Sequence, residues 1–259
     1  MPNRNLYQEA WTSSEGASLY EKARPGYAPA AVDFIISTFN IDSTSRVLDL
    51  AAGTGKLTRQ LLGSGAQITA VEPLPGMRQA FAEALPAITV VEGTAEAIPL
   101  PAESVDLVTA GQAWHWFDSK AALAEVTRIV KLGGALTLLW NVYDQTEPWM
   151  REFAAIRKSG TDSTPWRDEE HWQQAFAASA AWQPLQLELF SHRSVTTRDG
   201  LVERMLSSSV MTVLPESEKA NVREDILRVL DGHDETRGRK TIAVPYCTQV
   251  FWTVKLANA

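Results

Sequence analysis

The chain has 259 residues, of which 45% are hydrophobic and 21% charged, and its formal net charge is −7. This length and composition are typical of a globular protein with a large core, and they exclude a largely disordered chain. The negative charge disfavours binding to phosphate backbones and anionic membrane surfaces, and no basic run forms a local groove for them. We therefore expect neither a nucleic acid nor a membrane as a partner.

The N-terminal residues contain no apolar core of the kind a signal peptide needs, and no window is long and apolar enough to span a bilayer. These features predict a cytoplasmic protein, either a monomer or a homodimer. Cys247 is the only cysteine, so an internal disulfide or a cysteine metal site is excluded, and we expect no metal site.

The segment before the central unit is expected to pack against the domain and to cover a pocket. Pro29 suits the first turn of a helix that continues to Phe39. Arg24 could hold a carboxylate, and Tyr20 and Tyr27 could line a pocket. A surface leader with aromatic anchors explains the same residues equally well, so both interpretations stay open.

Residues 46–72 show the signals of a strand, a glycine turn, a helix and a second strand that ends in an acid. Gly53 and Gly55 allow the backbone to turn sharply and to approach a ligand, at the positive end of the helix that begins at Lys56. Glu72 stands where a carboxylate can accept both hydroxyls of a ribose. Because these features occur together, they favour nucleoside binding over a tight turn followed by a solvated glutamate.

Strand and helix signals alternate five times up to residue 144, which predicts an α/β fold with a doubly wound, mostly parallel sheet. Two later strands, over 185–190 and 241–255, follow a break in this alternation. They predict an antiparallel hairpin at the sheet edge and a seven-stranded sheet in total. The expected parts are a leader and helix that cover the pocket (1–40), a cofactor-binding Rossmann-like core (41–144), a Trp-rich helical lid (145–184), and strands and helices that complete the sheet (185–259).

Three large aromatic residues surround His115 just after the fourth predicted strand. Open α/β sheets bind their ligands at the carboxyl ends of such strands. A pocket role is therefore slightly favoured over core packing for Trp114 and Trp116, and over a structural role for His115. Trp140 and Asn141 fall at the carboxyl end of the fifth strand, again on the expected ligand side.

The glycine turn and its acid are compatible with two nucleotide-binding systems. The nicotinamide fingerprint requires Gly or Ala at its third glycine position, where this chain has Thr58, and this weakens a dehydrogenase interpretation. The motifs over residues 20–141 together resemble the class I S-adenosylmethionine-dependent methyltransferases, in the small-molecule branch with a methyltransferase type 11 domain. The family's D-x-G-x-G-x-G turn matches residues 49–55, with Ala51 at the first glycine position.

The resemblance implies a Rossmann-like methyltransferase fold and assigns residues to the cofactor S-adenosyl-L-methionine. The glycine turn would lie along its methionine part, Glu72 would hold the ribose hydroxyls, and Met77 would border the adenine. Thr94 replaces the Asp that usually accepts from the adenine amino group, while the Ala95 N–H could still meet the ring. The cofactor-binding residues expected are Arg24, Asp49, Ala51, Gly53, Thr54, Gly55, Glu72, Pro73, Met77, Thr94, Ala95, Glu96, Gln112 and Trp114; the substrate pocket is expected to contain Tyr20, Tyr27, His115, Trp116, Trp140 and Asn141.

The implied reaction is S-adenosylmethionine-dependent methyl transfer to a small-molecule acceptor by in-line displacement, with O-, N- and C-methylation all open. His115 could act as the base for a hydroxyl or phenol, because its ordinary pKa of about 6.5 suits proton transfer, whereas a carboxylate acceptor needs no base. Trp114, Trp116 and Trp140 could attract the sulfonium through cation–π contacts of about 0.5–2 kcal/mol each. The alternatives are an NAD(P)-dependent oxidoreductase and a non-catalytic cofactor-binding protein of the same fold.

Overall fold

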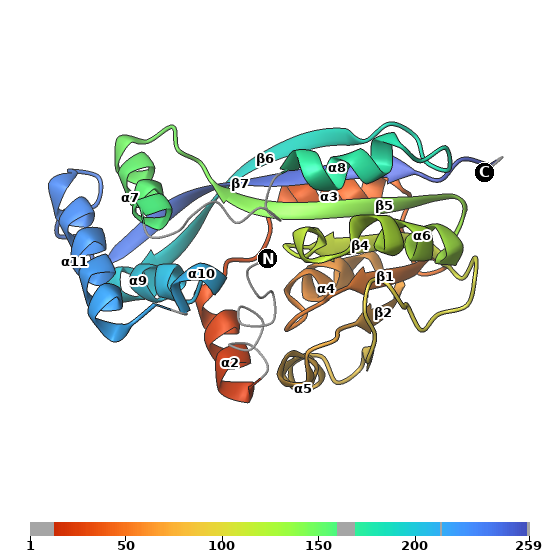
Figure 1. Cartoon of the computed structure of the whole chain (residues 1–259), viewed down its shortest axis with the longest axis horizontal. Coiled ribbons are helices and arrows are strands. Elements are labelled where there is room, and N and C mark those ends of the chain that lie inside the picture. The colour runs from red at the N-terminus through yellow and green to blue at the C-terminus, as the bar shows by residue number, and fades with distance from the viewer. Residues whose placement is uncertain (1–12, 160–168, 213, 258–259) are drawn as a thin grey trace.

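The computed structural model describes residues 13–159, 169–212 and 214–257. Its centre is a seven-stranded sheet in the order β3-β2-β1-β4-β5-β7-β6 (Figure 1). The strands are β1 (Arg46–Leu50), β2 (Gln67–Val71), β3 (Thr89–Val91), β4 (Val105–Gly111), β5 (Val130–Tyr143), β6 (Gln186–Thr197) and β7 (Thr241–Val254).

Helices flank the sheet, and local sequence signals fix several of their ends. The Ser13 side chain caps the first of them, Pro29 occupies the first turn of the next, and the Asp118 carboxylate accepts from two backbone amides at the start of α6. The helices are α2 (Ser14–Ala23), α3 (Pro29–Thr38), α4 (Lys56–Leu61), α5 (Pro75–Ala84), α6 (Ser119–Ile129), α7 (Pro148–Ser159), α8 (Glu169–Ala177), α9 (Arg198–Leu206), α10 (Ser209–Thr212) and α11 (Glu216–Gly232), with 3₁₀ turns η1 (Leu62–Ser64) and η2 (Trp114–Trp116).

The five strands β1 to β5 are parallel, and apolar side chains cover both of their faces. Val47 and Leu107 belong to a cluster formed with α3 and α4, whereas Leu48 and Val108 belong to a cluster formed with α6 and α8. Successive residues of a strand point to opposite faces, so the near-continuous apolar runs in the sequence reflect helices on both sides. The doubly wound parallel sheet is confirmed.

The sheet edge is antiparallel, as expected, but its outermost strand, β6, is longer than predicted. β7 pairs with β5 on one side and with β6 on the other, so it lies inside the sheet, and α9 to α11 occupy the connection between β6 and β7. The predicted end of β6 at Phe190 was wrong, because pairing continues to Thr197 opposite Thr241. β5 is also long, because Val130 pairs with Val105 at its start and Tyr143 pairs with Tyr246 at its end.

A third apolar cluster lies where the long strands β6 and β7 extend beyond the parallel core. Helices α7, α9 and α11 gather around these strand ends (Figure 1). Trp149 and Phe153 of α7 pack there with Leu201 of α9 and Ile226 of α11, all of them fully or almost fully buried. The extended ends of β6 and β7 thus have a hydrophobic core of their own.

The two Trp-rich helices take different places. α7 joins the third cluster, while α8 packs against α6 and η2 through Trp172 and Phe176. Neither helix contributes a residue to the cavity described below, and residues 160–168 between them lie outside the described part. The lid over the pocket therefore stays a prediction.

The leader is helical where it is described, and residues 1–12 lie outside that part. α2 lies against α5 on one side and α9 on the other (Figure 1).

Within the described ranges, every helix is too short or too polar to span a lipid bilayer.

Candidate functional site

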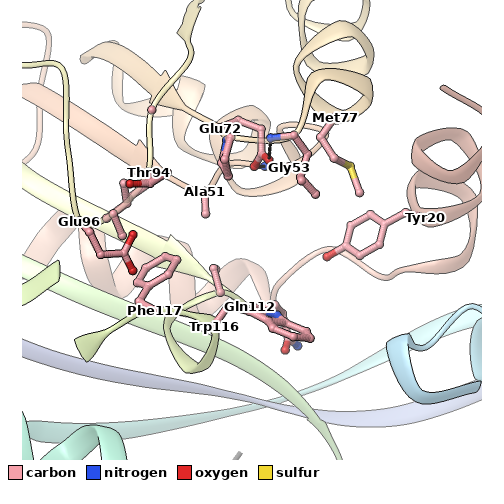
Figure 2. A pocket seen from close by; sticks show the side chains of 17 residues that line it. Tyr20, Ala51, Gly53, Glu72, Met77, Thr94, Glu96, Gln112, Trp116 and Phe117 are labelled. Carbon is pink, nitrogen blue, oxygen red and sulfur yellow. Dashed lines mark hydrogen bonds between the residues drawn. The ribbon is translucent and has the colours of Figure 1, made fainter. Parts of the chain in front are cut away.

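A cavity of about 280 Å³ opens beside the carboxyl ends of β1, β2 and β4 (Figure 2). Most of its walls come from the motifs singled out in the sequence. The predicted residues that line it are Tyr20, Ala51, Gly53, Glu72, Pro73, Met77, Thr94, Ala95, Glu96, Gln112 and Trp116; the lining residues that sequence reasoning missed are Leu50, Leu74, Gly93, Gly111, Ala113 and Phe117.

The glycine turn uses left-handed backbone conformations at three positions. Ala51, Gly53 and Gly55 have φ angles of 55°, 57° and 83°. Such angles are disfavoured for residues with a Cβ, so the two glycines allow a turn that Ala51 makes under strain. Gly53 directs its amide toward the carboxylate at the end of β2, whereas Gly55 starts α4 and faces the core.

Glu72 is the acidic group of the cavity. Its side chain is 4% exposed, and its two carboxylate oxygens accept from the backbone amides of Gly53 and Leu74, each at 2.8 Å. Burial raises the pKa of Glu72, while these two bonds and the charge of Arg78 act in the opposite direction. Since each carboxylate oxygen has two lone pairs, both can still accept from a ligand hydroxyl.

Helix α2 is held against the glycine turn by Glu21. The Thr54 hydroxyl donates to Glu21 Oε2 at 2.5 Å, and Lys56 Nζ and Arg59 Nη1 lie 3.3 and 3.1 Å from Oε1. Burial alone would raise the pKa of Glu21, but these partners together lower it. Thr54 therefore holds the leader rather than lining the cavity, and this arrangement presents Tyr20 to the cavity (Figure 2).

Asp49 lies behind the turn and does not line the cavity. Its side chain is 1% exposed, the Thr58 hydroxyl donates to Oδ2, and Oδ1 has no hydrogen-bond partner in the described structure. Thr58 stands at the third glycine position of the nicotinamide fingerprint. The threonine at this position has a structural role, because its hydroxyl donates to the buried Asp49. Burial raises the pKa of Asp49 from 3.8 to about 7, although the bond from Thr58 opposes this shift.

The raised pKa of Asp49 predicts a pH-dependent contribution to stability. Between about pH 4 and pH 7 the folded protein holds a proton at Asp49 that the unfolded chain releases, so this residue makes the free energy of unfolding fall as the pH rises. The Asp49→Asn variant should lose this slope, which amounts to up to about 4 kcal/mol over that window. Urea denaturation of both proteins at several pH values measures it; a stability difference that does not change with pH would contradict the assignment.

The aromatic strand end divides between the core and the cavity. Trp116 and Phe117 line the cavity. Trp114 does not: it is fully buried and packs against Phe117 and Phe176, with ring centroids 5.3 and 5.4 Å apart. The expectation of a cofactor contact for Trp114 is thus replaced by core packing, because α8 covers this side of η2.

His115 and Trp140 form a pair next to the cavity rather than in its lining. Trp140 Nε1 donates to His115 Nδ1 at 3.2 Å, and His115 is 9% exposed. An Nδ1 that accepts a hydrogen bond is the unprotonated nitrogen of a neutral imidazole, and the other nitrogen then carries the proton. The nitrogen that a general base would use is already occupied, so the geometry favours a positioning role for His115.

Tyr27 and Asn141 support the cavity wall from behind. The Asn141 side-chain amide donates to the Gly26 carbonyl at 2.9 Å, and the Asn141 backbone carbonyl accepts from the Gln112 side-chain amide at 3.0 Å. A Cβ added to Gly111 would lie 2.2 Å from the Tyr27 hydroxyl, so the closely packed tyrosine requires a glycine at the end of β4. Sequence reasoning missed Gly111 as a wall residue, although a glycine at the end of a buried strand could have indicated it.

Arg24 lies beside the cavity, behind Tyr20. Its guanidinium carbon is 5.6 Å from the centre of the Tyr20 ring, and Nη2 donates to the Ser207 carbonyl at 3.5 Å. Arg24 does not line the cavity itself, and the same holds for Gly55.

Comparison with known proteins agrees with this architecture. The family model described as a methyltransferase domain matches residues 48–138. An uncharacterized methyltransferase from Mycobacterium tuberculosis is 35% identical over 88% of this chain and 89% of its own length. An uncharacterized methyltransferase-like protein from Schizosaccharomyces pombe is 34% identical over 91% of this chain and 92% of its own length.

Solved structures of low sequence identity share the fold. A protein assigned as a type II methyltransferase from Anaeromyxobacter dehalogenans superposes with a TM-score of 0.67 at 18% identity, covering 90% of this chain and 98% of its own. A phosphoethanolamine N-methyltransferase from Haemonchus contortus, solved with phosphomonomethylethanolamine and S-adenosylhomocysteine, gives a TM-score of 0.57 at 14% identity, covering 98% of this chain and 60% of its own. With its sheet order, its glycine turn and relatives that match over most of their length, this chain belongs to the methyltransferase family.

Proposed function

We propose that this methyltransferase takes its methyl group from S-adenosylmethionine and transfers it to a small-molecule acceptor. The observation that carries the proposal is Glu72, a buried carboxylate at the end of β2 whose two oxygens are oriented by backbone amides at the edge of a cavity. A carboxylate in this place is suited to accept the two vicinal hydroxyls of a ribose.

The other walls fit the rest of a nucleoside. Phe117 offers an apolar face to a purine, and Thr94 and Glu96 lie on the same side of the cavity (Figure 2), whereas Met77 lies beside Tyr20. Ala95, which follows Thr94 in the chain, also lines the cavity. The cavity volume of about 280 Å³ is slightly below the range of about 300–1,000 Å³ that is common for small-molecule sites. A Cβ on Gly53 would meet no atom within 4 Å, so this side of the turn is open to a ligand.

The residues of the chain would act mainly by alignment and exclusion of water. Bound S-adenosylmethionine would supply the methyl group of its sulfonium, which passes in line to the acceptor and leaves S-adenosylhomocysteine. Tyr20 and Trp116 both line the cavity (Figure 2), and their rings can attract a cation while keeping water out. Holding two reactants in line can lower the barrier by about 7–11 kcal/mol, so displacement does not require a general base.

Family membership removes the oxidoreductase alternative, and a non-catalytic cofactor-binding protein is the remaining one. Titration of the purified protein with S-adenosylmethionine, S-adenosylhomocysteine and reduced nicotinamide cofactor by calorimetry tests the cofactor. We expect binding of the first two and none of the third; absence of heat with both sulfur nucleosides would refute the proposal. Incubation with a metabolite extract and labelled S-adenosylmethionine, followed by mass spectrometry, then tests transfer to a small molecule, and binding without transfer would favour the non-catalytic alternative.

His115→Asn is expected to leave turnover largely intact. The asparagine amide oxygen can still accept from Trp140 Nε1, so the variant keeps the contact that holds this indole. Turnover should fall by less than about tenfold, whereas removal of a general base typically costs roughly 10²–10⁴-fold. The kcat for the identified acceptor is the measurement. A loss of the larger size, with unchanged cofactor affinity, would restore the base role.

A further inference from the structure

Among the described residues, Arg24 beside the cavity and Arg204 behind it have no carboxylate partner. Arg204 of α9 is 4% exposed and donates to the Ala23 carbonyl at 2.8 Å, to the Tyr246 hydroxyl at 3.1 Å and to Ser194 Oγ at 3.5 Å. Arg24 makes the contacts with Tyr20 and Ser207 given above. Throughout the described residues, no carboxylate forms a salt bridge with either guanidinium. We call these residues, together with Ser208, the two-arginine cluster.

The two-arginine cluster also contains polar atoms without a hydrogen-bond partner in the described structure. Arg24 Nε and Ser208 Oγ are buried and have no hydrogen-bond partner in the described structure, and Ser208 as a whole is 3% exposed. Ser208 directly follows the residue whose carbonyl Arg24 contacts. A buried charge costs several kcal/mol unless an opposite charge compensates it, and buried polar atoms in native proteins usually have partners. The cluster therefore has the donors and the charge to bind an anion.

The nearby acids are committed elsewhere. Glu21 is engaged by Thr54, Lys56 and Arg59 on the glycine turn. Glu72 accepts from two backbone amides. The C-terminal carbonyls of α2 offset part of the charge, since Arg204 donates to one of them, but a carbonyl supplies only a partial negative charge.

The proposed cofactor does not neutralise the positive charge of the two-arginine cluster. S-adenosylmethionine brings one carboxylate, but it also brings an ammonium group and a sulfonium, so it adds positive charge overall. The cluster adjoins the cavity at Tyr20, whereas Thr94 and Glu96 lie at the far side of it (Figure 2). This places the unmatched charge next to the end of the cavity that is opposite the proposed purine site.

We propose that the two-arginine cluster binds the oxyanion of the methyl acceptor, so that the acceptor is a small molecule with a carboxylate or phosphate group. Arg24 and Ser208 would contact the oxyanion, and Arg204 would supply charge from behind. Guanidinium groups bind both kinds of oxyanion through paired hydrogen bonds. This inference rests on the proposed function, because it treats the cavity beside Tyr20 as the cofactor site.

The test is direct binding of two probes, succinate and inorganic phosphate, by calorimetry with and without S-adenosylhomocysteine. We expect at least one probe to bind the wild-type protein, and the probe that binds better identifies the class of oxyanion. Arg24→Gln and Arg204→Gln should each weaken that probe by roughly tenfold or more, and Ser208→Ala by a smaller factor. Arg204→Lys should retain part of the affinity because it keeps the charge. Arg228→Gln, which removes an exposed arginine that pairs with Asp225 far along α11, is the matched control and should bind as wild type does.

Affinity for S-adenosylhomocysteine and the melting temperature are recorded for every variant. Absence of binding of both probes by the wild-type protein would overturn the inference. Arginine variants that lose S-adenosylhomocysteine but keep the probe would overturn it as well, because the cluster would then serve the cofactor. So would an Arg204→Gln variant that melts earlier with unchanged probe affinity, since its role would then be to cap α2. If S-adenosylhomocysteine does not bind the wild-type protein, the proposed function fails, and the titrations without it still decide the anion site.

Discussion

Glu72→Ala is expected to weaken binding of S-adenosylmethionine by roughly 100-fold or more. The carboxylate can accept two ribose hydroxyls, and a hydrogen bond to a charged group contributes about 1.5–3 kcal/mol. Glu72 is also 4% exposed, so water cannot readily take over its role in the variant. Calorimetric titration of the variant and the wild-type protein gives the ratio of the two dissociation constants.

Controls separate this binding loss from a loss of structure. Glu72→Ala leaves the amides of Gly53 and Leu74 without their acceptor, and each unsatisfied buried donor costs about 1–3 kcal/mol. Urea denaturation should therefore accompany each titration, at a temperature where the variant is folded. Glu92→Gln is the matched control, because it removes a nearby carboxylate whose side chain is 76% exposed and which pairs with Arg78. Equal affinities of Glu72→Ala and wild type would refute the assignment of the ribose site.

Alanine at the two glycines of the turn should separate stability from binding. A Cβ at Gly55 would lie 2.7 Å from Leu85 and 2.9 Å from Phe81, in addition to the strain of a φ angle of 83°. The backbone strain costs about 1–2 kcal/mol and overpacking about 1–3 kcal/mol. Gly55→Ala should therefore lower the free energy of unfolding by roughly 2–5 kcal/mol, which urea denaturation measures.

Gly53→Ala is the matched comparison, because the φ angle of 57° is also left-handed while nothing lies within 4 Å of the added Cβ. It should cost only the backbone strain of about 1–2 kcal/mol. Since Gly53 lines the cavity and Gly55 does not, cofactor affinity should fall more in Gly53→Ala. A stability loss in Gly53→Ala equal to that in Gly55→Ala, or a reversed order of binding losses, would contradict this division of roles.

The local parts of the fold could be predicted from sequence because short-range signals determine them. α4 begins at Lys56 as predicted, since a glycine turn precedes it, and the Thr197 side chain caps the start of α9. Glu72 was found in the same way, because the lengths of the turn, the helix and the second strand bring it to the carboxyl end of β2 beside Gly53.

Contacts between distant segments could not be predicted from such signals. The bond between Glu21 and Thr54 joins residues that are separated by most of the leader and the first strand, and no local pattern indicates it. Trp114 and Trp116 occur in one short motif, yet the first enters the core and the second lines the cavity, because α8 packs on only one side of η2. β6 likewise continues to Thr197 because β7 is there to pair with it, which depends on the whole chain.

The separate apolar cluster around α7, α9 and α11 has a consequence for how such a protein can diversify. The residues that pack there contribute to neither of the two clusters beneath the parallel strands. Replacements among them can reshape the surroundings of Arg204, which α9 carries, without repacking the layers that support Glu72 and the glycine turn. If the two-arginine cluster binds the acceptor as proposed, changes of acceptor preference can accumulate at one end of β6 and β7 while the walls around Glu72 keep their shape.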